Sequence, residues 1–321
     1  TGVMRRFALA RGMLDFPNRR SSHSVPTPRG GGIAIMFASF GGITALTVFE
    51  LIADNLFLGL FSGGLLAGVV GYLDDRGHVP AGWRLSVHFA AAIVLLVCAG
   101  SLPPMTALGL TLVPGLITSA ILLLLIVWIL NLYNFMDGID GIAGVEATTV
   151  GGCAAVLLWY VSEPGLAVLV AVYAAASFGF LIWNWAPAKI FMGDSGSGFL
   201  GFSLGALMVL SNTSAEFPMW SWLILLGVFI VDATVTLVRR VLNRERWYEP
   251  HRDHAYQHAA RRYNSHGLVA ACVAAINIIW LFPLAALATM VPQWNLVFLV
   301  IAWLPLLVAS LYFEAGRRIP G

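Results

Sequence analysis

The chain has 321 residues, of which 59% are hydrophobic and 11% are charged, and its formal net charge is +2. A water-soluble protein of this length has too little interior to bury so much apolar surface. The composition therefore predicts one polytopic membrane domain over residues 1–321, with no nucleic-acid partner. The three cysteines lie far apart inside apolar runs, which predicts neither a disulfide nor a zinc site.

Residues 1–30 are basic and polar, carry no cleavable signal peptide, and end in Pro-Thr-Pro-Arg-Gly-Gly-Gly. Apolar stretches then recur to the end of the chain, each close to the ~20 residues that cross a bilayer core. They are 31–51, 56–73, 85–101, 115–133, 142–161, 165–183, 196–211, 219–238, 267–289 and 293–313. The pattern predicts an all-α helical bundle of about ten membrane spans, with both chain ends on one side.

The basic residues divide the connections into two sets. All 18 Lys and Arg residues lie in one alternate set or at its helix ends, and the other set holds none. The basic set is 1–30, 74–84, 134–141, 184–195, the large loop 239–266 and the tail after 313. By the positive-inside rule this side is cytoplasmic. The acidic clusters and all seven histidines fall on or near the same side, which predicts an active site at the cytoplasmic face.

The densest polar cluster spans residues 131–144, between two apolar stretches. Asn131, Asn134, Asp137 and Asp140 lie within ten residues, among three glycines that allow close backbone approach. Such residues are costly in a membrane and are usually retained for function. The cluster predicts one wall of a metal and phosphate site. The alternative is a polar turn in which Asp140 caps the next helix.

A second cluster, Asp74-Asp75-Arg76, ends the second span. Two carboxylates at the negative end of a helix dipole need a compensating cation. We expect Arg76 to supply part of that charge and a divalent metal to supply more. The alternative is a solvated acidic helix end.

The segment 191–198, Phe-Met-Gly-Asp-Ser-Gly-Ser-Gly, precedes the seventh span. Glycines and hydroxyls at a helix start favour phosphate binding by backbone N–H groups, which leaves Asp194 for a metal. The alternative is that Asp194 only caps the helix.

The loop 239–266 holds seven arginines and no lysine. This pattern favours forked recognition of phosphate oxygens, with a basic patch on anionic lipid as the alternative. Asp232, just before the loop, is expected to be an internal partner of a polar group.

Together these clusters favour Mg²⁺, with Mn²⁺ as the alternative ion, and phosphoryl transfer from a nucleotide-linked substrate to one held in the bilayer. The second class of function is a transporter or lipid flippase with an acidic cytoplasmic gate. That class more often places ionisable residues near the bilayer midplane.

Four motifs carry a resemblance to a known family. Gly-Tyr-Leu-Asp-Asp (71–75), Asn-x-x-Asn-x-x-Asp-Gly-x-Asp-Gly (131–141), Phe-Met-Gly-Asp-Ser-Gly-Ser (191–197) and His-Arg-Asp-His-Ala-Tyr-Gln (251–257) resemble the polyprenyl-phosphate N-acetylhexosamine-1-phosphate transferases, glycosyltransferase family 4. The segment 17–32 is similar to the first cytoplasmic loop of the branch that initiates O-antigen and lipopolysaccharide synthesis. The resemblance implies a bacterial inner-membrane enzyme that converts a UDP-N-acetylhexosamine and undecaprenyl phosphate into undecaprenyl-diphosphate-sugar and UMP, with Mg²⁺.

The resemblance implies catalytic or metal-binding roles for five matching positions. Asp194 would ligate Mg²⁺ beside the diphosphate. Asp74 and Asp75 would organise the lipid phosphate and the metal, with Asp75 as a second metal ligand. Asp140 and His254 complete the catalytic set.

The other matching positions would bind the substrate. The nucleotide cleft would be shaped by Asn131, Asn134 and Asp137. The uracil would be contacted by Asn184 and, through stacking, by Phe191. The diphosphate would be held by His251 and Arg252.

The chain also departs from the family pattern. His251-Arg252-Asp253-His254 replaces the triple histidine of the peptidoglycan branch, which argues against a muramyl-pentapeptide substrate. The family has one further span before the first cytoplasmic loop, so we expect an N-terminal span beyond this sequence and eleven in all. The resemblance leaves the sugar and the oligomeric state open, a homodimer being common among relatives.

The acceptor phosphate would be mostly dianionic at neutral pH, since the second pKa of a phosphate monoester is near ~6. A general base would gain little. Direct attack of the lipid phosphate on the β-phosphorus is therefore favoured, and a two-step route with Asp75 or Asp140 as nucleophile is the alternative.

Overall fold

The computed structural model describes residues 1–17, 25–77, 79–100, 105–107, 110–212, 217–245 and 252–317. In these residues the chain is helical almost throughout. The strands form two short antiparallel pairs, β1 (Leu14–Asp15) with β2 (Thr27–Pro28) and β3 (Met105–Ala107) with β4 (Leu110–Leu112). The all-α prediction is confirmed.

The helices are named in chain order. They are α1 (Gly2–Ala10), α2 (Gly32–Val48), α3 (Asp54–Arg76), α4 (Ala81–Ala99), α5 (Leu116–Met136), α6 (Ile142–Tyr160), α7 (Pro164–Asn184), α8 (Asp194–Ser211), α9 (Met219–Leu225), α10 (Gly227–Leu242), α11 (Ala255–Tyr263), α12 (His266–Ala275), the π-helix η1 (Ile276–Leu281), α13 (Phe282–Met290), the 3₁₀ turn η2 (Pro292–Trp294) and α14 (Asn295–Tyr312).

Every predicted apolar stretch forms a helix or a series of joined helices. Among the described residues, seven helical segments are long and apolar enough to cross a membrane. Helices α9 and α10, which meet at a bend of 74°, count as an eighth where the pair is taken as one span. The two predicted spans outside this set are α2, which has 17 residues, and α8, whose first turn is polar. The chain is therefore a polytopic helical membrane protein.

Helix α8 is the central helix of the bundle. All its residues after Asp194 are buried, and it packs against α3 and α5. A Cβ on Gly201 would lie 2.8 Å from the Cα of Leu130, so glycine permits the close approach of α5. The short, glycine-rich stretch that the sequence shows at 196–211 is thus an interior helix.

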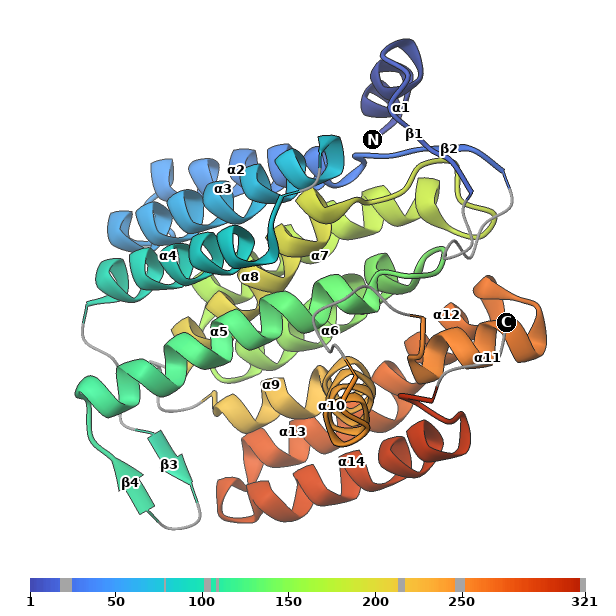
Figure 1. The fold of residues 1–321 in the computed structure, drawn as a ribbon. Coiled ribbons are helices and arrows are strands. Elements are labelled where there is room, and N and C mark those ends of the chain that lie inside the picture. The colour runs from blue at the N-terminus through green and yellow to red at the C-terminus, as the bar shows by residue number, and fades with distance from the viewer. Residues whose placement is uncertain are drawn as a thin grey trace.

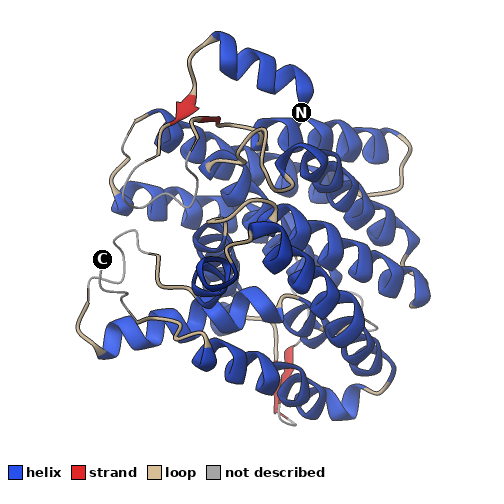
Figure 2. Ribbon diagram, turned by 90° about the vertical axis from the view of Figure 1, so that its right-hand side faces the viewer, coloured by secondary structure: helices blue, strands red, loops and turns tan. Residues whose placement is uncertain are grey.

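Figure 1 shows α2 to α8 in the upper part of the view and α9, α13 and α14 in the lower part. Helix α10 appears end-on because it runs across its neighbours. Figure 2 shows the same bundle from the side, with α1 lying outside it near the N-terminus. Helix α1 was not predicted within the basic segment 1–30.

Two predicted segments are more structured than expected. The loop 239–266 contains the end of α10 and all of α11, and the predicted span 267–289 is interrupted by η1. A π-helix inside a longer helix often marks a functional or strained position.

Candidate active site

The site is built where the start of α2, the end of α3 and the start of α8 meet. A Cβ on Gly32 would lie 2.1 Å from the Cα of Gly196, and one on Gly71 would lie 2.3 Å from the carbonyl oxygen of Asp194. Only glycine fits at such distances. The first contact brings the start of α2 against the first turn of α8, and the second brings the end of α3, with its carboxylates, against the same turn.

Asp75 caps helix α8 from the neighbouring helix. Its carboxylate accepts hydrogen bonds from the backbone N–H groups of Asp194 (2.9 Å) and Ser195 (3.1 Å), and its side chain is only 3% exposed. The capping group of α8 therefore comes from α3, and Asp194 leaves its own carboxylate available. The predicted metal-binding and catalytic roles of Asp75 stay predictions.

Arg29, which follows β2, joins these two carboxylates. Its Nε lies 2.8 Å from Asp75 Oδ1 and its Nη2 lies 2.8 Å from Asp194 Oδ1. Arg29 was not predicted as a site residue, although it stands in the Pro-Arg-Gly-Gly-Gly run at the start of α2.

Asp74 faces a different cation. It accepts a hydrogen bond from the backbone of Val79 (2.8 Å) and forms an ion pair with Arg84 of α4. Arg84 also lies 3.8 Å from Asp194 Oδ2. The expected role of Arg76 is therefore corrected, because its guanidinium lies over the Tyr72 ring (4.9 Å), while Arg29 and Arg84 face the two carboxylates.

Asp137, which follows the last residue of α5, lies in the field of the same carboxylates. Burial raises its pKa to about 7, opposed by Arg29 and assisted by the charges of Asp194, Asp75 and Asp140. Burial likewise raises the pKa of Asp194 to about 6, against the effect of Arg29. The site therefore holds more negative charge than its arginines balance.

A divalent cation would relieve this imbalance. In the described residues, no three His, Cys, Asp or Glu side chains converge closely enough to enclose an ion by themselves. Mg²⁺ is commonly held by one or two carboxylates together with substrate phosphates and water. Asp194, with a side chain 27% exposed, and the nearby Asp137 fit that mode.

Asn131 and Asn134 project from α5 toward α4. The Asn134 side chain donates to the Ser197 hydroxyl (2.8 Å), and the Asn131 side chain donates to the Val127 carbonyl (2.7 Å). Both line a cavity of about 480 Å³ that also reaches Asp194. The structure thus brings the first motif cluster to the start of α8, as predicted for a shared site.

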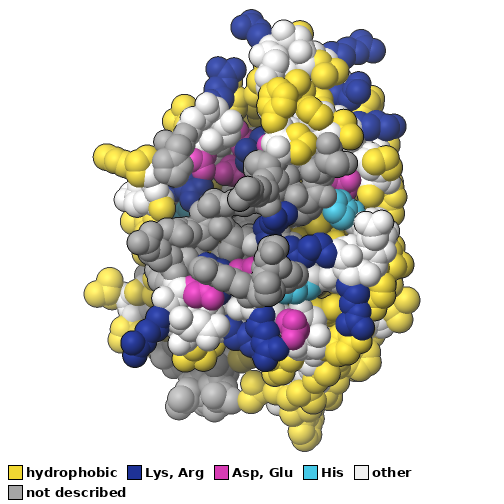
Figure 3. Space-filling model, turned by 45° about the vertical axis from the view of Figure 1, so that its right-hand side comes forward, with side chains coloured by type: hydrophobic (Ala, Val, Ile, Leu, Met, Phe, Trp, Pro, Cys, Tyr) yellow, Lys and Arg dark blue, Asp and Glu magenta, His cyan; other side chains and the backbone are white. Residues whose placement is uncertain are grey.

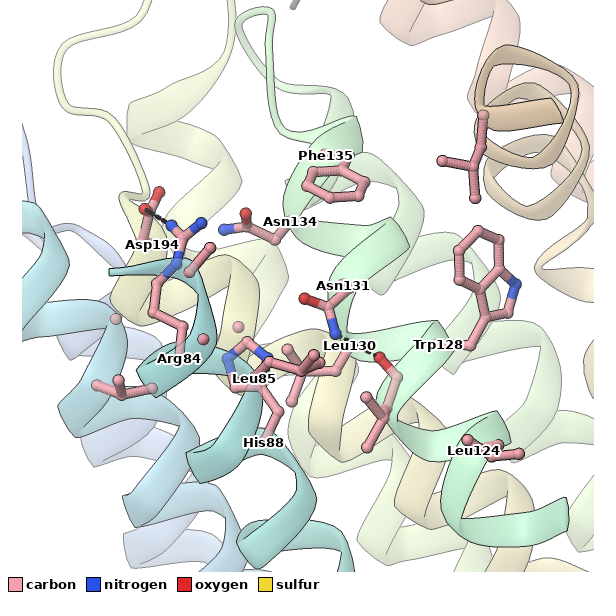
Figure 4. A pocket seen from close by; sticks show the side chains of 17 residues that line it. Arg84, Leu85, His88, Leu124, Trp128, Leu130, Asn131, Asn134, Phe135 and Asp194 are labelled. Atoms are coloured by element: carbon pink, nitrogen blue, oxygen red, sulfur yellow. Dashed lines mark hydrogen bonds and ion pairs between the residues drawn. The ribbon is translucent and has the colours of Figure 1, made fainter. Parts of the chain in front are cut away.

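The cavity is polar at one end and apolar along its walls (Figure 4). Arg84, Asn134 and Asp194 lie at its polar end, and α3, α4, α5, α8 and α10 all contribute to its lining. The apolar lining residues include Leu85, Leu124, Val127, Trp128, Leu130 and Leu237. The cavity can accept a molecule with a charged head and a hydrocarbon body.

Asp140 lies in the turn between α5 and α6. It accepts a hydrogen bond from the backbone of Ala188 (3.0 Å), and its Oδ2 is 3.5 Å from Nδ1 of His266, at the start of α12. His266 was not selected from the sequence, since a single histidine directly after Ser265 carries no recognisable motif. The pair fixes the start of α12 to the acidic turn.

Asn184 and Phe191 flank the connection between α7 and α8. The Asn184 side chain is buried and bonds to the Gly141 N–H and the Ile190 carbonyl (both 3.0 Å), so here it shapes the connection. Phe191 is half-buried, and its backbone bonds to Pro28 and Gly31. Their predicted contacts with uracil stay predictions.

The fourth motif is held by Asp232 of α10. Asp232 accepts from the N–H groups of Ala255 (2.9 Å) and Tyr256 (3.0 Å) and lies 3.2 Å from Nδ1 of His254. The expectation that Asp232 is an internal partner is confirmed. His254 is buried beside it, with a side chain 3% exposed.

Tyr256 links this motif to the acidic turn. Its hydroxyl donates to the Phe135 carbonyl (3.2 Å) and lies where a Cβ on Gly138 would be. Arg252 is half-buried and its carbonyl accepts from Arg261 (2.8 Å). His251 lies outside the described residues. Figure 3 shows basic, acidic and histidine side chains gathered on this face of the molecule.

Comparison with known proteins gives consistent matches. The sequence profile of glycosyl transferase family 4 matches residues 57–212. The chain is 29% identical over 270 residues to a Bacillus subtilis (strain 168) protein named "Probable undecaprenyl-phosphate N-acetylglucosaminyl 1-phosphate transferase", covering 80% of this chain and 72% of that protein.

Two further relatives are similar at about the same level of identity. A "Decaprenyl-phosphate N-acetylglucosaminephosphotransferase" of Mycolicibacterium smegmatis is 31% identical over 243 residues, which cover 68% of this chain and 57% of that protein. A "Phospho-N-acetylmuramoyl-pentapeptide-transferase" of Bacillus pumilus is 32% identical over 231 residues, which cover 68% of this chain and 69% of that protein.

Proposed function

The chain belongs to glycosyl transferase family 4, the polyprenyl-phosphate N-acetylhexosamine-1-phosphate transferases, and we propose on that premise that it acts on a UDP-N-acetylhexosamine and undecaprenyl phosphate. The products are undecaprenyl-diphosphate-sugar and UMP. The observation that carries this proposal is the cavity whose charged end holds Arg84 and Asp194 and whose walls are apolar. A polyprenyl phosphate has the same division between head and body.

The reaction forms one P–O bond and breaks another. An oxygen of the lipid phosphate attacks the β-phosphorus of the UDP-sugar, the bond from that phosphorus to the bridging oxygen breaks, and UMP leaves with the electron pair. Arg84 and Arg29, which flank Asp194, would orient the two phosphate groups and neutralise their charge. No proton needs to be removed from a dianionic acceptor.

The residues present fit a divalent cation of the Mg²⁺ type. Asp194 and Asp137 would hold it, because they lie among carboxylates whose charge the arginines do not balance and oxygen ligands suit this ion. When bound, Mg²⁺ supplies charge stabilisation for the diphosphate oxygens; Mn²⁺ has the same ligand preference.

The covalent alternative is less well supported by the geometry. Both oxygens of Asp75 accept backbone hydrogen bonds, and one also pairs with Arg29, so a nucleophilic Asp75 would have to break the cap of α8. Asp140 accepts from Ala188 beside His266. Direct transfer leaves both carboxylates in place.

The sugar class follows from the motif that holds His254. Because this chain has Arg252 and Asp253 where the peptidoglycan branch has histidines, we include in the proposal an N-acetylhexosamine without a peptide, as in O-antigen initiation. The buried ion pair of Arg240 with Asp253 supports a role for Asp253 in folding the motif. The proposal places the site at the cytoplasmic face of the bacterial inner membrane.

UMP release from purified protein in detergent tests the function. The assay contains undecaprenyl phosphate, Mg²⁺ and a panel of UDP-N-acetylhexosamines. We expect UMP only when lipid and metal are both present, and a loss of at least about 100-fold for Asp194→Asn, the size seen when one preorganised electrostatic group is removed.

The matched control is Asp54→Asn, an exposed carboxylate at the opposite end of α3, which should keep full activity. If folded protein releases no UMP from any sugar nucleotide, the transferase proposal fails. Transport of the lipid then becomes the function to test, in reconstituted vesicles.

A further inference from the structure

One polar side chain in the cavity has no role in the proposed chemistry. His88 of α4 is 8% exposed, and its Nδ1 has no hydrogen-bond partner among the described residues. It lines the cavity, one helical turn from Arg84. Leaving a buried polar atom unpaired costs free energy, so a group that enters the cavity is the natural partner.

His88 belongs to an arrangement with two levels (Figure 4). On α4, Arg84 and His88 are four residues apart and share one face. On α5, Asn134 and Asn131 are three residues apart and also face the cavity. Arg84, Asn134 and Asp194 form the outer level, and His88 and Asn131 form the inner level.

The surroundings of the inner level restrict its ligand. Around it the cavity is lined by Leu85, Val127 and Leu130, so a free nucleotide would leave those walls uncovered. The His88 ring is hydrogen-bonded to the Asn131 side chain, and its unpaired Nδ1 is an N–H donor in one neutral tautomer and in the protonated ring. The guanidinium at the outer level requires an anion. An alkyl phosphate monoester meets all three conditions.

Resting on the proposed function, we propose that His88, with Asn131, binds the phosphate head of the acceptor lipid at the inner level and sets how deeply that head enters. Arg84 then binds the outer phosphate oxygens, and one oxygen remains beside Asp194. His88 is thus an acceptor-binding residue, with no contact to the sugar nucleotide.

The experiment separates acceptor from donor. His88→Phe fills the volume without an N–H, His88→Gln keeps a donor, and Ser86→Ala, on an exposed part of α4, is the matched control. For each variant, KM is measured for undecaprenyl phosphate and for the UDP-sugar. Dissociation constants for undecaprenyl phosphate, undecaprenol and inorganic phosphate are measured by native mass spectrometry without Mg²⁺ or sugar nucleotide.

We expect His88→Phe to raise the acceptor KM and Kd by about 10- to 100-fold, the effect of one hydrogen bond to a charged group. The KM for the UDP-sugar and the affinity for undecaprenol should stay within twofold, and His88→Gln should recover most of the loss. Inorganic phosphate should bind far more weakly than the lipid.

Any of three results would overturn the proposal. The first is an unchanged affinity for undecaprenyl phosphate in both His88→Phe and His88→Gln. The others are an equal rise of the KM values for acceptor and UDP-sugar, and a loss of affinity for undecaprenol equal to that for undecaprenyl phosphate. If His88→Phe does not fold, His88→Gln and His88→Ala decide by the same criteria. If the wild type binds undecaprenyl phosphate but releases no UMP, the proposed function is rejected. The dissociation constants of the variants would still test whether His88 binds the lipid phosphate.

Discussion

Asp75 and Asp232 are two carboxylates that cap helices to which they do not belong. Asp75 of α3 accepts from two successive N–H groups at the start of α8 and pairs with Arg29. Asp232 of α10 accepts from two successive N–H groups at the start of α11 and pairs with His254. Asp75 replaces the side-chain cap that the start of α8 lacks. At α11, Asp232 adds to a capping box in which Gln257 accepts from the His254 N–H (3.3 Å).

The two sites differ in what surrounds the cap. Next to Asp75, the side chains of Arg29 and Asp194 are partly exposed beside the cavity. Asp232 and His254 are both closed off from solvent. The same type of helix cap therefore leaves charged side chains open to a ligand at Asp75 and holds the start of α11 in place at Asp232.

The largest expected effect is at the first cap. Asp75→Ala leaves two helical N–H groups without their acceptor and Arg29 with Asp194 as its remaining carboxylate partner, so we expect a loss of about 3–5 kcal/mol in the free energy of unfolding, as for a broken buried pair. Asp75→Asn, which keeps one acceptor oxygen, should lose less. Unfolding in detergent micelles measures both. Equal stability of Asp75→Ala and wild type would contradict the capping role.

A smaller loss is expected at the second cap. Asp232→Ala should cost about 1–3 kcal/mol, the penalty for leaving buried donors unsatisfied, and should loosen α11 locally. Limited proteolysis, read by mass spectrometry, should show new cleavage near residues 243–263 while α8 stays protected. Cleavage spread over the whole chain would show that Asp232 supports the global fold.

Next in size is the effect of pH on Mg²⁺ affinity at the site that contains Asp75, Asp137 and Asp194. The pKa of Asp137 is raised to about 7, so in the absence of a cation its stabilising contribution is present at low pH and is lost as pH rises through that value. Protons then compete with Mg²⁺, and Mg²⁺ affinity should rise about tenfold from pH 6 to pH 8. Calorimetric titration of wild type and Asp137→Asn checks this, since only the wild type should show the full slope.

The smallest effect is expected at Arg76. Because it lies over Tyr72 and faces neither cap, Arg76→Gln should change the free energy of unfolding by no more than about 0.5 kcal/mol and leave activity within twofold. Arg84→Gln, made in parallel, should reduce activity by at least tenfold. Similar losses in the two variants would restore the charge compensation first expected from the sequence.

Local pattern was enough to predict the helices. Each apolar stretch from 31–51 to 293–313 is helical because its length and hydrophobicity leave the backbone no other way to satisfy its polar groups in a membrane. The bend after Leu225 and the π-helix at Ile276–Leu281 depend on packing between distant segments, which no local pattern reports.

The motif carboxylates were predictable for a similar reason, since Asp and Asn beside apolar runs are conspicuous. The arginines that pair with these carboxylates could not be predicted from the sequence. Arg29 and Arg84 reach Asp194 across 165 and 110 residues of chain, and an isolated arginine carries no signal of its partner. Sequence proximity favoured Arg76, but the helix turns its side chain toward Tyr72, four residues earlier.

The walls of the cavity reach the outside of the bundle. Leu85 and Leu124 line it and yet are 41% and 58% exposed, so a hydrocarbon chain can pass sideways from cavity to surrounding lipid. The proposed lipid acceptor would then meet the protein by diffusion in two dimensions, without passing through water. Turnover in micelles should accordingly follow the mole fraction of acceptor among detergent molecules and fall by surface dilution when detergent is added at constant bulk acceptor concentration.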